Sequence, residues 1–286
     1  MNRVTIATEY SSEFLQVERP KPLSDNRLEQ TIHDVLFGKM DHDISDNVYY
    51  DFKTECSHWF LGSKLNRLTG LERFERLDII NGCTQYIDNI YMNGPVQTMY
   101  GDYRYHERLG LSTVIHDYTQ LIPKVPLIIA LPFPNNGKSH NHIIEILDTS
   151  LERDIPVHID SAWISASRDI EFDYSHPAIE SVGMSLSKGL GLGWNRVGLR
   201  WQRHFCQDAI TIMNDYNMNL RAVAKIGLHF VRQFPSDYLW NAHGEQYYKV
   251  CKDFNLRPTN SIHLALDGYD PVGVSPLIRY LDEQPK

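Results

Sequence analysis

The sequence predicts an α/β protein built around a mainly parallel central sheet, and two apolar stretches carry this prediction. Residues 125–130 are apolar almost throughout, as is typical of a strand that is buried on both faces of a parallel sheet. A turn rich in Pro, Asn and Gly follows, then a helical stretch at about 139–153, and then a second apolar strand at 157–159. A strand, a turn, a helix and a strand form one right-handed βαβ unit, so we expect these two strands to be parallel.

The overall composition is that of an ordinary globular protein, with 42% hydrophobic and 22% charged residues among 286. The net charge of −8 argues against nucleic acid as the main partner. No apolar run approaches the length of a membrane span, and the first residues lack a signal pattern, so we expect a cytoplasmic protein that does not bind membranes. The four cysteines lie far apart without Cys-x-x-Cys spacing, so we expect neither a disulfide framework nor a metal site.

Three side chains between residues 156 and 201 suggest one cofactor. Asp160 ends an apolar strand and so lies at the carboxyl edge of the sheet, where open α/β folds bind ligands. Lys188 lies among Ser, Gly and apolar residues, where a lysine loses its proton more easily and can form a Schiff base. Arg196, eight residues later, supplies a fork suited to a phosphate. These groups match the ring nitrogen, the aldehyde and the phosphate of pyridoxal 5'-phosphate.

The same stretch resembles the cofactor-binding core of the fold-type I pyridoxal-phosphate enzymes, the aspartate aminotransferase-like superfamily. The family shows Asp-x-Ala-Tyr at a strand end, then Ser-x-x-Lys, then Arg-x-Gly eight residues beyond the lysine. This sequence has Asp160-Ser161-Ala162-Trp163, Ser185-Leu186-Ser187-Lys188 and Arg196-Val197-Gly198. The resemblance implies a three-layer sandwich with a mainly parallel central sheet, which binds pyridoxal 5'-phosphate in an active site between two subunits.

The resemblance also assigns roles to the matched residues. Lys188 and Asp160 would be catalytic, and both would contact the cofactor, with Ser185 and Arg196 at its phosphate. Trp163 departs from the family, which usually carries a tyrosine that donates a hydrogen bond to the cofactor's phenolate oxygen. The indole N–H of a tryptophan is also a donor, so we expect Trp163 to contact the cofactor.

A strand followed by a glycine turn precedes the motifs described above. Residues 76–80 read as the strand, and Asn81-Gly82-Cys83-Thr84-Gln85 opens a helix, whose free N–H groups and dipole suit a phosphate. The family carries a Gly- and Ser/Thr-containing turn here, so we expect Gly82, Cys83 and Thr84 to bind the cofactor. A reactive cysteine is the alternative for Cys83, because a helix N-terminus lowers the pKa of a thiol.

Two further cofactor contacts follow from the resemblance. Tyr103 matches the aromatic residue that stacks on the pyridine ring, with Tyr100 and Tyr105 as rivals, and simple packing is the alternative for all three. Asn135, with Asn136 close behind, matches the asparagine that binds the ring hydroxyl. The alternative for both asparagines is a turn without ligand contact, because Pro-Asn-Asn-Gly forms turns in any protein.

Two more residues are assigned from weaker matches. A helix is expected at about 54–68, and in the family a tyrosine shortly before it reaches the phosphate of the neighbouring subunit, which implies a homodimer. Tyr50 takes this place, with Tyr49 as the alternative, although both also suit a core or an interface. Arg279 resembles the strand arginine that holds the substrate carboxylate, with Arg257 as the alternative and a solvated arginine as the default for either.

Three segments are expected along the chain. They are an N-terminal arm at 1–45 with a helix near 28–37, a large cofactor-binding domain at 46–207, and a linking helix with a reduced α+β small domain at 208–286. Apolar residues at 208–233 fall near one stripe, which predicts a single long helix. The few residues beyond it include a helix near 245–253 and an apolar strand at 261–266.

The resemblance implies an aminotransferase that acts on an α-amino acid and a 2-oxo acid through a Schiff base on Lys188. Asp160 would keep the ring nitrogen protonated, so that the ring accepts electrons. A lyase or decarboxylase on α-amino acids uses the same fold and stays open as an alternative. The reduced small domain leaves a third hypothesis, a non-catalytic remnant that binds the cofactor.

Overall fold

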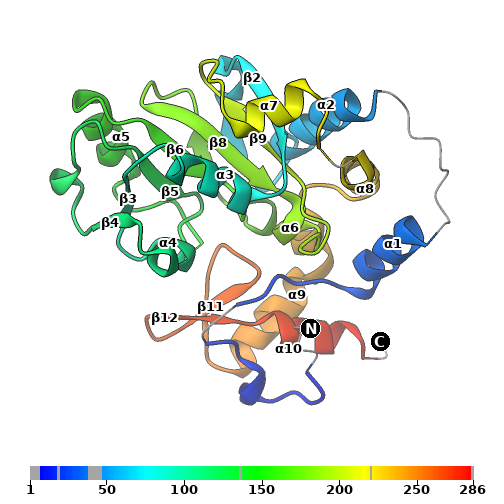
Figure 1. The fold of residues 1–286 in the computed structure, drawn as a ribbon. Coiled ribbons are helices and arrows are strands. Elements are labelled where there is room, and N and C mark those ends of the chain that lie inside the picture. The colour runs from blue at the N-terminus through cyan, green and yellow to red at the C-terminus, as the bar shows by residue number, and fades with distance from the viewer. Residues whose placement is uncertain (1–6, 18–19, 38–46, 135–136, 220, 285–286) are drawn as a thin grey trace.

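A seven-stranded sheet forms the centre of the protein (Figure 1). The computed structural model describes residues 7–17, 20–37, 47–134, 137–219 and 221–284. Along the sheet the strand order is β2-β9-β8-β6-β5-β3-β4. The strands are β2 (Arg76–Ile80), β3 (Val96–Met99), β4 (Ser112–Ile115), β5 (Leu127–Ala130), β6 (Val157–Asp160), β8 (Ile179–Ser185) and β9 (Gly198–Gln202). Five neighbouring strands, from β8 to β4, are parallel, whereas β9 is antiparallel to both β8 and β2. The predicted mainly parallel sheet is confirmed.

Ten α-helices and five further strands lie in the described part of the chain outside this sheet. The helices are α1 (Asn26–Leu36), α2 (Val48–Leu61), α3 (Cys83–Tyr91), α4 (Arg104–Leu109), α5 (Ile143–Glu152), α6 (Leu186–Gly189), α7 (Ala209–Asp215), α8 (Arg221–Gln233), α9 (Tyr238–Asp253) and α10 (Ser275–Asp282). The further strands are β1 (Arg67–Thr69), β7 (Glu171–Asp173), β10 (Arg257–Pro258), β11 (Leu264–Asp267) and β12 (Asp270–Gly273). The predicted βαβ unit is β5-α5-β6, and all four residues of β5 are buried, as expected of a central parallel strand.

Helices cover both faces of the sheet, which gives three layers. On β9, Arg200 bonds to Asp208 at the start of α7, while the ring of the next residue, Trp201, lies 5.5 Å from that of Phe60 on α2. Successive residues of a strand point to opposite faces, so α7 and α2 lie on opposite sides of the sheet. On the α7 side, Tyr86 of α3 lies against Gly183 of β8, where a Cβ atom would be only 2.4 Å from the tyrosine ring.

The helix expected at 54–68 begins and ends earlier, because α2 spans Val48–Leu61. The carboxylate of Asp237 accepts hydrogen bonds from the Ser63 hydroxyl and the Lys64 backbone N–H. The Lys64 N–H therefore donates to a side chain instead of to a backbone carbonyl of the helix, and the helix does not continue. It continues into β1, which pairs with β7 in a separate parallel ribbon.

The single long helix predicted at 208–233 is wrong, because α7 and α8 are separate helices. Asn217 between them has a φ of 51°, a left-handed conformation that ends a helix. The side chain of Asn214 also binds both the N–H and the carbonyl of Ile79, which fastens the end of α7 to β2. Apolar spacing continues across this break, so the pattern alone could not reveal it.

A small α+β unit lies beside the large sheet, as predicted, and Figure 1 shows it below the sheet in orange and red. It contains the antiparallel sheet β10-β11-β12 together with α9 and α10, which pack on each other. Helix α9 begins at Tyr238, earlier than predicted, and β11 begins at Leu264. The N-terminal segment joins this unit through a bridge between Gln16 and Gly273. No helix in the described ranges is both long and apolar enough to cross a membrane.

Arg200 ties three elements together inside the protein. Its guanidinium, with 2% of the residue exposed, donates to Asp78 on β2 and to Asp208 at the start of α7. We expect Arg200→Met to lower the free energy of unfolding by about 3–5 kcal/mol, because it leaves Asp208 without its cation and the buried Asp78 with Arg76 alone.

Urea denaturation measures this loss, and Arg67→Met is the matched control. Arg67 pairs with Glu171 at the surface, where both side chains are more than 70% exposed, so its loss should cost less than about 1 kcal/mol. Equal effects of the two substitutions would contradict the role given to Arg200.

Candidate active site

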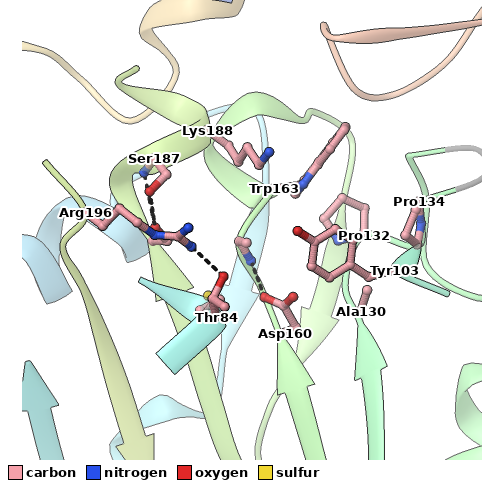
Figure 2. Close-up of a pocket in the computed structure, with 13 residues that line it drawn as sticks. Thr84, Tyr103, Ala130, Pro132, Pro134, Asp160, Trp163, Ser187, Lys188 and Arg196 are labelled. Carbon is pink, nitrogen blue, oxygen red and sulfur yellow. Dashed lines mark hydrogen bonds between the residues drawn. The ribbon is translucent and has the colours of Figure 1, made fainter. Parts of the chain in front are cut away.

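A pocket opens at the carboxyl edge of the sheet, where β5, β6 and β8 end side by side (Figure 2). The space between its walls, with the solvent in its mouth, amounts to about 530 Å³. Thirteen residues line it: Cys83, Thr84, Tyr103, Ala130, Pro132, Pro134, Asp160, Ala162, Trp163, Ser185, Ser187, Lys188 and Arg196. Parallel strands bring their carboxyl ends to one edge, so residues far apart in the sequence meet here.

Asp160 forms the floor of the pocket, at the last position of β6. The residue is 6% exposed, and its Oδ1 accepts a hydrogen bond from the Ala162 N–H at 3.0 Å. Burial raises the pKa of Asp160, although the Cys83 thiol and the Ala162 N–H both donate to the carboxylate and act in the opposite direction. A bound cation would stabilise the ionised form of this carboxylate further.

Lys188 lies on the opposite side of the pocket, on the short helix α6 that directly follows β8. Ser185 begins this helix, with its Oγ accepting from the N–H of Ser187 at 3.2 Å. The Lys188 Nζ lies 5.2 Å from the centroid of the Trp163 ring. Burial, assisted by the positive charge of Arg196, lowers the pKa of Lys188 to about 8. The amine is therefore a better nucleophile near neutral pH than an ordinary lysine.

Hydrogen-bond donors for an anion gather at one end of the pocket. Arg196 donates to the Thr84 hydroxyl at 2.6 Å, beside the N-terminus of α3. Gly82 precedes that helix with a φ of 76°, and a Cβ there would lie 3.1 Å from Arg196 Nε and 3.2 Å from Ser185 Oγ. Glycine thus lets the helix N-terminus approach the arginine. The first N–H groups of a helix lack helical partners, so this end of the pocket suits a phosphate.

Cys83 lies between the anion end and the floor of the pocket. Burial raises the pKa of the Cys83 thiol well above its ordinary value, and the negative charge of Asp160 acts in the same direction. These two effects outweigh the helix N-terminus, on which the alternative of a reactive cysteine depended. The thiol instead serves as a hydrogen-bond donor to Asp160.

Two aromatic side chains, Tyr103 and Trp163, form the wall opposite Arg196. The buried carboxylate of Asp102 accepts from the N–H groups of Tyr103 and Ala130, which ties Tyr103 to the end of β5. The rival tyrosines do not line the pocket: Tyr100 is exposed, and Tyr105 donates to Asp88. Of the three tyrosines, only Tyr103 is therefore placed to contact a ligand.

Several predicted residues are not brought to the pocket. Arg279 lies on α10 instead of a strand, and Glu29 and Glu283 hold its guanidinium. Arg257, the alternative, is exposed on β10.

Three other predicted positions lie elsewhere. Tyr50 is 71% exposed on α2, and Tyr49 donates to the carbonyl of Asn219. Asn135 and its alternative Asn136 lie outside the described residues.

Five lining residues were not singled out from the sequence, namely Ala130, Pro132, Pro134, Ala162 and Ser187. Each lies next to a predicted motif: at the end of the 125–130 strand, in the turn after it, or within the motifs that contain Asp160 and Lys188. Their position beside a motif was therefore the sequence signal that could have predicted them as pocket residues. Ser187 has a contact of its own, because its hydroxyl and that of Ser185 lie 2.8 Å apart.

No family model matches this chain, and no curated protein matches it. Solved structures do match. An aspartate aminotransferase from Rhizobium meliloti is 11% identical with a TM-score of 0.61, over 87% of this chain and 73% of that one. A tyrosine aminotransferase from Leishmania infantum is 10% identical with a TM-score of 0.60, over 93% of each chain. A histidinol-phosphate aminotransferase from Clostridium acetobutylicum is 13% identical with a TM-score of 0.55, over 87% and 81%. The protein therefore has the fold of the fold-type I aminotransferases, as the sequence motifs predicted.

The lowered pKa of Lys188 predicts how its reactivity depends on pH. Only the unprotonated amine attacks, so the rate of labelling by a small amine-reactive reagent should rise with pH and level off above about 8. An ordinary surface lysine should continue to gain reactivity up to about pH 10.4. Peptide mass spectrometry of the labelled protein measures both rates, and a midpoint for Lys188 like that of surface lysines would contradict the effect of burial.

Proposed function

We propose that the protein is a pyridoxal-phosphate-dependent aminotransferase that acts on an α-amino acid and a 2-oxo acid, with Lys188 as the amine that forms the Schiff base. One observation carries the proposal: Lys188, Asp160 and Arg196 line a single pocket, with the carboxylate at its floor and the arginine at one end. The amine, the carboxylate and the anion site are the three groups that the aldehyde, the ring nitrogen and the phosphate of this cofactor require. The likeness of the fold to several aminotransferases supports the same reaction class.

The residues of the pocket fit the cofactor in chemistry and placement. The phosphate would be held by the side chains of Arg196, Thr84 and Ser185. The first backbone N–H groups of α3, which begins at Cys83, would also bind it. The absence of a Cβ at Gly82 supports this fit, because it keeps the helix N-terminus close to the arginine. Tyr103 would stack on the ring, and Trp163 would donate to its phenolate oxygen, with Asn135 as a further contact. When bound, the cofactor supplies an aldehyde for amines and a ring that accepts electrons from the neighbouring carbon.

Lys188 and Asp160 would carry the proton transfers. The Lys188 amine, with its pKa lowered to about 8, would take the proton from the substrate's α-carbon. It would then deliver this proton to the carbon that belonged to the cofactor's aldehyde. Asp160 would hold a proton on the ring nitrogen, and that cation would in turn keep the buried carboxylate ionised. Arg196 and Thr84 would fix the opposite end, so that the reacting atoms keep their positions.

We also propose a cytoplasmic homodimer in which Tyr50 reaches the phosphate of the neighbouring subunit. Two exposed aromatic residues support an interface: Tyr50 on α2 and Trp194 in the loop before Arg196, 71% and 80% exposed. The proposed domains are 46–207 and 208–286, with an arm at 1–45. Sedimentation tests the dimer, because one chain has a mass of 33.2 kDa. A monomer that binds the cofactor at full affinity would refute the shared site.

Cofactor binding is the first test of this function. Purified protein with added pyridoxal phosphate should gain a visible absorption band, and borohydride should then fix the cofactor covalently on Lys188, as found by peptide mass spectrometry. Lys188→Ala should lose both signals and keep its thermal unfolding temperature, because the half-buried side chain makes no structural hydrogen bond among those described. If the natural protein gains no absorption band, the proposed function is refuted and the protein is a non-catalytic remnant of this fold.

Product analysis then separates the reaction classes. An aminotransferase given an amino acid converts the cofactor to its amine form and releases the 2-oxo acid, whereas a lyase or decarboxylase leaves the cofactor as the aldehyde. We expect the amine form with the natural protein and its near absence with Asp160→Ala, because the ring nitrogen then loses its anion. An Asp160→Ala variant that converts the cofactor at the natural rate would disprove the role of the carboxylate.

A further inference from the structure

A buried histidine of the small α+β unit touches the turn that carries Lys188. Helix α6 is short, so the carbonyl of Lys188 near its end has no helical partner. The Nε2 atom of His263 lies 3.2 Å from this carbonyl oxygen. The histidine is 0% exposed and lies just before β11, seventy-five residues away from Lys188 in the chain. It thus caps the helix that presents the amine.

The hydrogen bonds of His263 determine where its proton lies. Its Nδ1 accepts from the backbone N–H of Leu23 at 3.1 Å, so this nitrogen carries no proton. Nε2 must then carry the proton and donate it to the carbonyl of Lys188. Burial and the positive charge of Lys188 lower the pKa of His263 to about 3, which keeps the ring neutral. A charged imidazole would direct an N–H at the N–H of Leu23.

His263 also contacts the aromatic wall of the pocket. Its ring packs edge-to-face on Trp163, with 5.5 Å between the centroids and 80° between the planes. The Lys188 amine lies over the same indole, 5.2 Å from its centroid. One histidine therefore contacts both the backbone of the lysine and the surface on which its amine lies.

The segment around Leu23, which donates to His263, is itself held in place by other contacts. Ser24, next to Leu23, packs against Gly191 in the loop that follows α6, where a Cβ would lie 3.0 Å from the serine hydroxyl. Asp25 begins α1 and accepts from Tyr238 and His243 of α9. Because the segment is held at both places, the Leu23 N–H is a firm donor for the histidine.

We propose that His263 is a positioning residue for the Lys188 amine, and that it acts through its hydrogen bond to the carbonyl of that residue. The proposal rests on the proposed function only for the use of the amine; the geometry of the turn is a property of the protein without cofactor. Without the cap, the turn would loosen and the amine would move from its buried position toward water.

Two reciprocal substitutions separate the contacts of His263. His263→Gln keeps a donor near the place of Nε2 and loses the acceptor for Leu23, whereas His263→Asn keeps the acceptor and loses the donor to Lys188. Both remove the ring, so both lose the contact with Trp163 alike. Ser275→Ala is the control for a looser N-terminal segment, because its hydroxyl donates to the carbonyl of Lys21 at 2.8 Å in the same region.

The quantity measured is the pKa of the Lys188 amine in cofactor-free protein. NMR follows this amine after reductive ¹³C-methylation, and the Lys188→Ala variant identifies its resonance. We expect the Asn variant to raise this pKa from about 8 toward the ordinary 10.5, and the Gln and Ser275→Ala variants to stay near about 8. Borohydride trapping of pyridoxal phosphate should fall in the Asn variant alone. If the Asn and Gln variants behave alike, His263 has only a structural role and the proposal is overturned.

Two further outcomes keep the proposals apart. A contrast between Asn and Gln in the amine pKa, without trapping in any protein, would refute the proposed function and leave the role of His263 intact. If the variants do not fold, ¹⁵N NMR of the natural protein decides. It should show a protonated Nε2 and an unprotonated Nδ1 on His263 from about pH 5 to about pH 9, and the reverse tautomer would overturn the proposal.

Discussion

The antiparallel pairing of β9 with β8 is the constraint on which the site depends. Ser185 at the end of β8 faces Gly198 at the start of β9, and the Leu186 N–H donates to the carbonyl of Val197 at 3.0 Å. The strands approach so closely that a Cβ on Gly198 would lie 2.0 Å from the carbonyl of Met184. The chain between them is therefore a loop closed at its base. Both Lys188 and Arg196 therefore lie at the sheet edge where β6 ends with Asp160. The N-terminus of α3 contacts the arginine at the same edge.

This closed loop explains why the local motifs predicted so much of the site. The eight-residue interval from Lys188 to Arg196 lies within the connection at 186–197, which leaves β8 and returns on β9. Asp160 could be placed because a carboxylate directly after an apolar strand marks a strand end. The glycine before α3 predicted the helix N-terminus for the same kind of reason. Each of these features depends on residues within about ten positions of one another, which sequence patterns report well.

Features that depend on distant residues were not predictable in the same way. The break between α7 and α8 arises from a left-handed Asn217 and from the hold of Asn214 on β2, and apolar spacing carries no trace of either. Arg279 matched a short motif, but it lies on α10, and its pairing with Glu29 depends on how α1 and α10 pack together. His263 belongs to no recognisable motif, and its contacts with Leu23 and Lys188 appear only once three separate parts of the chain have come together.

The path from Leu23 through His263 to Lys188 has a consequence for the order in which the protein is made. A ribosome releases Leu23 and its neighbours long before it reaches His263, which lies 240 residues later. The large sheet can form during synthesis as its strands emerge, since from β4 onward each strand pairs with a strand already made, and β2 waits for β9. The turn that carries the lysine receives its cap only when the histidine emerges. Nascent chains therefore form the sheet before the amine site is finished, and the amine reaches its final position only after His263 has emerged.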